Sequence, residues 1–117
     1  MLQLQKIDNV CVFNLQGELS ISEIEHINST LESYIASPSS RIILNFEKVQ
    51  HLHYPSAIQL FHTLRKQNGK IKYVAMNNYI KEICRFIGAF EEKIHFDSIY
   101  DGIMSFEHEA GAYRTLH

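Results

Sequence analysis

The amino-acid sequence predicts an α/β fold in which a mixed, mostly parallel sheet carries four helices in the order β-β-α-β-α-β-α-β-α. Two apolar segments at the start are separated only by Asp8-Asn9, which is typical of an antiparallel hairpin. Residues 41–46 form a short apolar run without alternation, as in a central strand covered on both faces. Helical and extended patterns alternate beyond it, and such strand–helix–strand units require parallel pairing.

The length and composition indicate one domain with one core. The chain has 117 residues, of which 45% are hydrophobic, and this is enough for a single ordinary core. We expect the domain to cover residues 1–108. Residues 109–117 lack a pattern, and we expect them to form a fraying C-terminal tail.

The first half of the chain gives a hairpin followed by a helix. Residues 2–7 alternate between apolar and polar, and residues 10–15 form the second strand. Ser20 or Ser22 is suited to cap the helix that follows. That helix should end near Pro38. Its apolar positions recur every three or four residues: Ile24, Ile27, Leu31, Tyr34 and Ile35.

The second half alternates helices and strands. A helix after the connector 47–54 should stop at Asn68-Gly69, and a strand follows at 71–75. Asn77 or Asn78 is suited to cap the third helix. The remaining positions on which these elements depend are Ala57, Ile58, Phe61 and Leu64 in the second helix; Ile80, Ile83, Cys84 and Ile87, closed by Gly88, in the third; 94–96 in the last strand; and Ile99, Ile103 and Phe106 in a final helix from Ser98.

The charge balance argues against several classes of function. Lys and Arg total 11 against 13 Asp and Glu, without a basic run, so nucleic-acid binding is not expected. No segment approaches the ~20 apolar residues of a membrane span, and the start of the chain lacks the features of a signal peptide. We expect a cytoplasmic protein whose two cysteines, Cys11 and Cys84, are reduced thiols in apolar surroundings.

Four short motifs carry a resemblance to a known family. They are Gly17-Glu18-Leu19, the strand 42–46, Gly69-Lys70-Ile71 and Gly88. Together with the order of elements, they resemble the STAS domain, the family of sulphate-transporter C-terminal domains and bacterial anti-sigma factor antagonists. The resemblance covers nearly the whole chain and implies a noncatalytic protein-binding module.

The regulatory box of that family is altered in this sequence. In the family, an Asp-Ser-Ser-Gly box opens the second helix, and a kinase-type anti-sigma factor phosphorylates its second serine. His53, Tyr54, Pro55 and Ser56 occupy these four positions, so Pro55 replaces the phosphoacceptor. Ser56 is the only aliphatic acceptor nearby, but one residue along a helix rotates a side chain by roughly 100° and shifts it about 1.5 Å. Control by phosphorylation is therefore in doubt.

The resemblance implies a docking site around the start of the second helix. We expect a helix to begin there because proline suits a first turn. The free amides of this helix start should lie near the surface. The implied partner is a kinase-type anti-sigma factor; the alternative is constitutive docking on the ATPase of a lipid transporter or on a signalling scaffold. Dimerisation through the exposed first strand stays open. The candidate partner-binding residues are His53, Tyr54, Pro55, Ser56 and Gln59, flanked by Gly17, Glu18 and Ser20.

Histidines are the remaining candidates for chemistry. His51 and His53 would point to one side of an extended segment, and His62 lies about two turns into the helix, so three imidazoles could converge on zinc. No Cys or acidic ligand completes the set locally, and we expect no metal and no cofactor. A pH-sensitive contribution to partner binding stays open. Hydrolase and nucleotide-binding motifs are absent, so we expect no enzyme and no catalytic residue.

Overall fold

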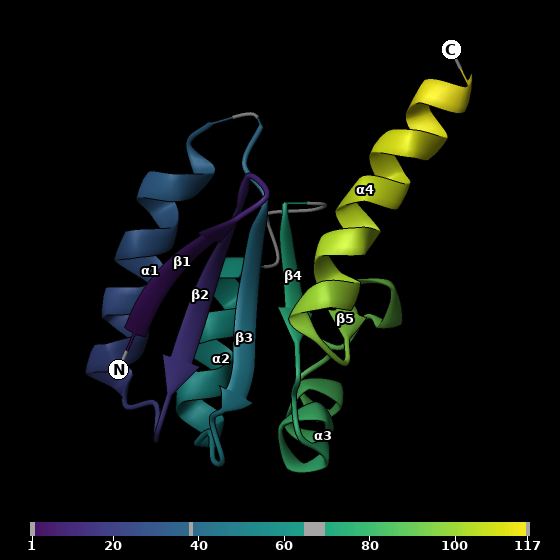
Figure 1. Cartoon of the computed structure of the whole chain (residues 1–117). Coiled ribbons are helices and arrows are strands. Elements are labelled where there is room, and N and C mark those ends of the chain that lie inside the picture. Colours follow the sequence, from purple (N-terminus) through teal and green to yellow (C-terminus); the bar gives the residue numbers. More distant parts are fainter. Residues whose placement is uncertain (1, 38, 65–69, 117) are drawn as a thin grey trace.

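The structure, a computed structural model, describes residues 2–37, 39–64 and 70–116, with side chains described as far as residue 108. Its elements follow the predicted order (Figure 1). The predicted helix stop at Asn68-Gly69 and the residue Pro38 lie outside the described residues. The strands are β1 (Leu2–Ile7), β2 (Val10–Gln16), β3 (Ile42–Lys48), β4 (Ile71–Val74) and β5 (His95–Phe96), and the helices are α1 (Ile21–Ile35), α2 (Tyr54–Leu64), α3 (Asn78–Phe86) and α4 (Ile99–Leu116).

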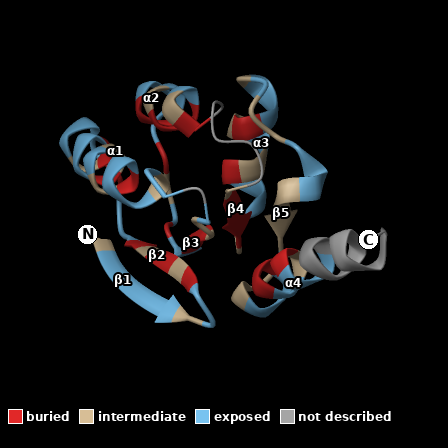
Figure 2. Cartoon of the chain, turned by 90° about the horizontal axis from the view of Figure 1, so that it is seen from above, coloured by how far each residue is buried: buried red, intermediate tan, exposed pale blue. Residues whose placement is uncertain are grey.

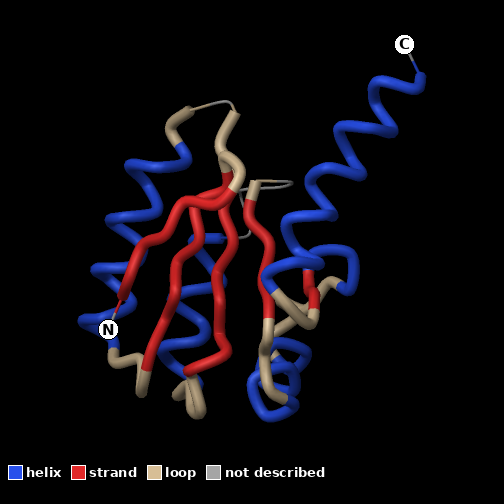
Figure 3. The backbone as a smooth tube through the Cα atoms, in the orientation of Figure 1, coloured by secondary structure: helices blue, strands red, loops and turns tan. Residues whose placement is uncertain are grey.

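The sheet is mixed, with spatial order β1-β2-β3-β4-β5. Strands β1 and β2 pair antiparallel, and all other pairs are parallel. Asp8 and Asn9 both have positive φ, at 48° and 67°, as a tight hairpin of primed type requires. The predicted central position of β3 is confirmed. It follows that the ends of β2, β3 and β4 lie at one edge of the domain, from which three loops lead into helices (Figure 3).

Helices cover both faces of the sheet, three on one and one on the other (Figure 2). Helices α1, α2 and α3 pack on the face that carries Phe13, Leu44 and Tyr73. The opposite face carries a smaller cluster, formed by Val10, Val12, Ile43 and Val74 with Ile103 and Phe106 of α4. Because β3 is buried on both faces, its apolar run does not alternate.

Gly102 permits the close approach of α4 to the sheet. A Cβ atom at this position would lie 2.9 Å from Val74 Cγ1 and 3.0 Å from Ile43 Cδ1. The helix then continues through residues 109–116, so the backbone of the predicted tail is helical rather than irregular. The domain boundary at residue 108 stays a prediction. None of the helices in the described ranges is long and apolar enough to cross a membrane.

His95, in the edge strand β5, is a half-buried titratable group. Its ring packs 4.9 Å from the ring of Tyr73 and 4.4 Å from that of Phe90. Both ring nitrogens are buried, and neither has a hydrogen-bond partner among the residues that the structure describes. This burial, together with the nearby charges of Lys81 and Arg85, lowers the pKa of His95 to about 4.

We predict that His95 makes the fold sensitive to acid. The contribution of His95 to the free energy of unfolding is fully present above the ordinary histidine pKa of about 6.5. It is lost as pH falls towards about 4, because the unfolded chain binds a proton that the ring in the folded chain does not. Between about pH 7 and about pH 4.5, the free energy of unfolding should fall by about 2 kcal/mol less in the His95→Phe variant than in wild type. This value is reduced to allow for the partial solvent contact of the ring. Urea unfolding at both pH values measures this difference.

The matched control is His26→Gln, at an exposed histidine of α1. It should leave the pH dependence of the unfolding free energy unchanged. If the free energy of unfolding of wild type and of His95→Phe falls equally on acidification, the His95 ring is not the cause of the sensitivity to acid.

Candidate functional site

The predicted docking residues lie where β3 passes into α2. Val49 donates its amide to the carbonyl of Phe46, 3.0 Å away, and turns the chain after the strand. Val49 and Leu52 are buried and hold the connector against the core. The helix then begins with the amide of Ala57 bonded to the carbonyl of His53 at 2.9 Å. Pro55 is therefore the second residue of α2, one position after the first helical position that proline prefers.

Most of the predicted residues at this turn face solvent, but Ser56 does not. His53, Tyr54 and Pro55 are exposed, and Gln59 is partly exposed. Ser56 is only 2% exposed, because its position on the helix points towards the sheet. The start of α2 therefore presents an imidazole, a phenol ring and a proline ring to a partner, and it keeps its one serine inside.

The Gly17–Ser20 loop lies beside this turn, as the sequence predicts. The amide of Gly17 bonds the carbonyl of Lys48 at 3.0 Å, which ties the end of β2 to that of β3. Gly17 has φ of 81°, a conformation that glycine adopts without strain. Buried Leu19 anchors the loop, and Ser20 caps α1 by accepting from the amide of Glu23 at 3.3 Å.

Glu18 connects the two segments. Its Oε1 lies 2.5 Å from Nε2 of His53, across a separation of 35 residues in sequence. The other nitrogen of His53, Nδ1, lies 3.3 Å from Nε2 of His51. When Nε2 of His51 and Nε2 of His53 each carry a proton, a continuous hydrogen-bonded chain runs from His51 through His53 to the carboxylate. His62 is not part of this group.

Helix α3 holds the connector from the other side. Asn77 caps α3 by accepting from the amide of Ile80 at 2.8 Å, and its side-chain nitrogen donates to the carbonyls of Val49 and Gln50 at 3.4 and 3.3 Å. Tyr79 stacks on His51 with ring centroids 5.2 Å apart. The cap at Asn77 was predictable from sequence, but its second role, like that of Tyr79, depends on the tertiary contact.

A groove between α2 and α3 adjoins the docking residues. We call it the α2–α3 groove; it has a volume of about 360 Å³ and is lined by Tyr54, Ile58, Phe61, His62, Phe86 and Ile87. The rings of Tyr54 and Phe86 meet edge to face at 5.5 Å. Phe86 is 78% exposed, and Tyr54 and Ile58 are 43% and 44% exposed. Phe86 was not among the predicted docking residues, although an aromatic residue outside the buried helical spacing of α3 is a signal that the sequence carries.

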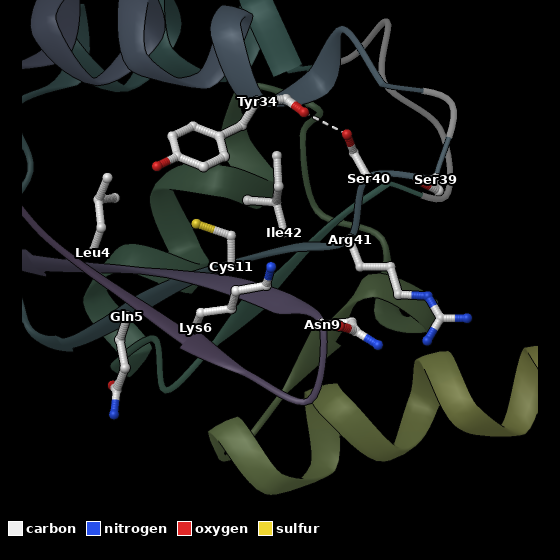
Figure 4. Close-up of a pocket in the computed structure, with 10 residues that line it drawn as sticks. All are labelled: Leu4, Gln5, Lys6, Asn9, Cys11, Tyr34, Ser39, Ser40, Arg41 and Ile42. Atoms are coloured by element: carbon white, nitrogen blue, oxygen red, sulfur yellow. Dashed lines mark hydrogen bonds between the residues drawn. The ribbon is translucent and has the colours of Figure 1, made fainter.

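A second cavity lies at the opposite end of the sheet, before β3 rather than after it (Figure 4). It has a volume of about 320 Å³, and its lining includes Cys11, Tyr34 and Arg41. Arg41 extends away from the Cys11 thiol and pairs with Glu107 at 3.5 Å. Burial raises the pKa of the Cys11 thiol, which disfavours the reactive thiolate. None of the predicted docking residues lines this cavity.

Solved structures share this fold. The anti-sigma factor antagonist SpoIIAA in its unphosphorylated form is 18% identical, with a TM-score of 0.68 over 88% of this chain and 93% of that one. An RsbS variant of Moorella thermoacetica is 10% identical, with a TM-score of 0.76 over 93% of this chain and 97% of that one. The murine anion transporter Slc26a9 is 16% identical, with a TM-score of 0.59 over 88% of this chain and 18% of that one.

A comparison with curated proteins finds no match. At such low identities the solved structures establish the fold alone. The family model of the STAS domain, however, matches residues 1–102, a span that includes every element from β1 to β5 and the start of α4. The chain belongs to the STAS domain family.

Proposed function

We propose that this domain is a noncatalytic module that binds a regulatory protein through a docking surface made of His53, Tyr54 and Pro55 together with the α2–α3 groove. The observation that carries the proposal is the group of exposed apolar side chains there, with Phe86 at 78%. Contiguous exposed apolar surface marks interaction sites on small proteins. Aromatic residues are also the usual anchors of protein interfaces.

The partner that we propose is a kinase-type anti-sigma factor in a bacterial partner-switching pathway. The family membership and the likeness to the antagonist SpoIIAA support this choice. In this role the domain acts in the cytoplasm together with that partner and takes part in the regulation of transcription. It involves no catalysis by this chain.

We further propose that this docking surface lacks the usual phosphorylation switch. Pro55 has no hydroxyl, and Ser56, the nearest aliphatic acceptor, is 2% exposed. A phosphate on a buried side chain would place a charge of about −1.5 to −2 in the core, and removing this charge from water would cost a large free energy. The domain would then behave as a permanently unphosphorylated antagonist that binds its partner without an off-switch.

A second candidate is constitutive docking on a larger assembly, such as the ATPase of a lipid transporter or a signalling scaffold. The missing acceptor serine favours it, because a fixed dock needs no switch. The STAS-like part of Slc26a9, which spans 18% of that transporter chain, is one case in which this fold accompanies a transporter. The identity of the captured partner separates the two candidates.

We predict that Phe86→Ala weakens partner binding at least about tenfold, since truncation of an interface anchor costs about 2 kcal/mol or more. Wild-type and variant chains, immobilised on beads, are compared for the proteins that they capture from the native bacterial extract. Mass spectrometry identifies the proteins, and titration of the purified partner gives the affinities. The first candidate predicts an anti-sigma kinase; the second predicts a transporter ATPase or a scaffold protein.

The matched control is Tyr100→Ala, at an equally prominent aromatic that is 69% exposed on α4. It should bind like wild type. Equal losses with both variants, or no loss with Phe86→Ala, would contradict the assignment of the α2–α3 groove.

We predict that Pro55→Ser creates a phosphorylation site. The new hydroxyl stands at the family's acceptor position, on an exposed first turn whose free amides tolerate a phosphate. Incubation with a kinase-type anti-sigma factor and ATP, followed by mass spectrometry of residues 51–63, should give phosphate on position 55 in the variant and none in wild type. Efficient phosphorylation of Ser56 in the wild-type chain would overturn the proposed loss of the switch.

We predict that Ser56→Asp destabilises the fold by about 3 kcal/mol or more, because it places a carboxylate at a buried position. The control Ser22→Asp, in the exposed first turn of α1, should be neutral or slightly stabilising, since the helix start favours an acidic side chain. Thermal and urea unfolding measure both. A Ser56→Asp chain as stable as wild type would show that the position tolerates charge.

A further inference from the structure

Three metal-ligating side chains converge where the Gly17–Ser20 loop meets the connector before α2. They are Glu18, His51 and His53, and their ligand atoms all lie within 4.8 Å of one another. The two loops are far apart in sequence and lie side by side because β2 and β3 are parallel neighbours. In sequence, His51 and His53 have His62 as their candidate third ligand and no acidic ligand nearby; the fold supplies Glu18 instead.

We propose that Glu18, His51 and His53 form a binding site for a divalent transition-metal ion of the zinc type. Two imidazoles and one carboxylate are a ligand set that zinc uses in three-ligand sites, in which water completes the tetrahedron. This mixture of nitrogen and oxygen donors suits zinc and its neighbours in the first transition row better than calcium or magnesium.

The two imidazoles already stand at the right separation. Nε2 of His51 lies 3.3 Å from Nδ1 of His53. Zinc–nitrogen bonds of 2.0–2.1 Å in a tetrahedron require about 3.4 Å between two ligand nitrogens. An ion between these atoms replaces the proton that they share. Glu18, whose carboxylate lies against Nε2 of His53, turns this carboxylate to the ion and supplies the third ligand.

The supporting backbone is fixed before any ion binds. The connector is held by buried Leu52 and by the two bonds that Asn77 donates to it. The ring of His51 is stacked on Tyr79. Metal binding therefore needs only side-chain rotation, which keeps its entropic cost small.

Glu18 has a second role, which is electrostatic. The site adjoins the start of α2, and the positive end of a helix dipole opposes a cation. The first turn of α2 contains no acidic residue that could offset this field. Of the three ligands, Glu18 is the one whose negative charge offsets it. Neutralising Glu18 should therefore weaken binding even where both imidazoles remain.

The test uses the full chain without a polyhistidine tag, treated with a chelator and then titrated with Zn²⁺ by calorimetry. We expect one equivalent to bind, and Co²⁺ in place of zinc to give the visible absorption of a tetrahedral or five-coordinate site. Glu18→Gln and His53→Ala should each weaken zinc binding at least about tenfold. Circular dichroism of each variant verifies that it is folded, and Glu18→Gln, an isosteric change, serves even if His53→Ala fails to fold.

The matched control is His62→Ala, at an exposed histidine of α2 outside this group. It should bind zinc like wild type. Absence of saturable binding at one equivalent, or an equal loss in His62→Ala, would overturn the site and leave the histidines as a hydrogen-bonded chain. The inference concerns this chain alone, so its failure leaves the proposed partner binding untouched.

Discussion

The parallel pairing of β2 and β3 is the constraint on which the rest of the molecule depends. It sends both strands to the same edge of the sheet, and the bond from the Gly17 amide to the Lys48 carbonyl holds their ends together. Residues 35 positions apart, Glu18 and His53, thereby meet. The burial of β3 on both faces agrees with its place at the centre of the sheet, beside β2.

The order of elements was predictable from sequence because each carries a local signal. Ser20 and Asn77 cap helices by bonds to their own neighbours, and the hairpin depends on two adjacent residues. The contacts that build the site were not predictable in the same way. The meeting of Glu18 with His53 depends on the register of two strands, and the exposure of Phe86 depends on which face α3 presents to the sheet.

The start of α2 presents different side chains on its outer and inner sides. Its outer side is apolar and aromatic, with Tyr54 against Phe86, whereas its only serine faces inward. Pro55, on the exposed side, restricts the backbone and offers no hydroxyl. On the function proposed above, this helix start would recognise a partner without acting as a switch.

The amide of Asn77 has a mechanical consequence. It bonds the start of α3 to the carbonyls of Val49 and Gln50 and so links the helix to the connector. A protein segment that wedges α3 away from α2 would pull on this linkage and draw His51 along with it through Tyr79. Occupancy of the groove would then be coupled to the arrangement of the imidazoles through the contacts of Asn77 and Tyr79.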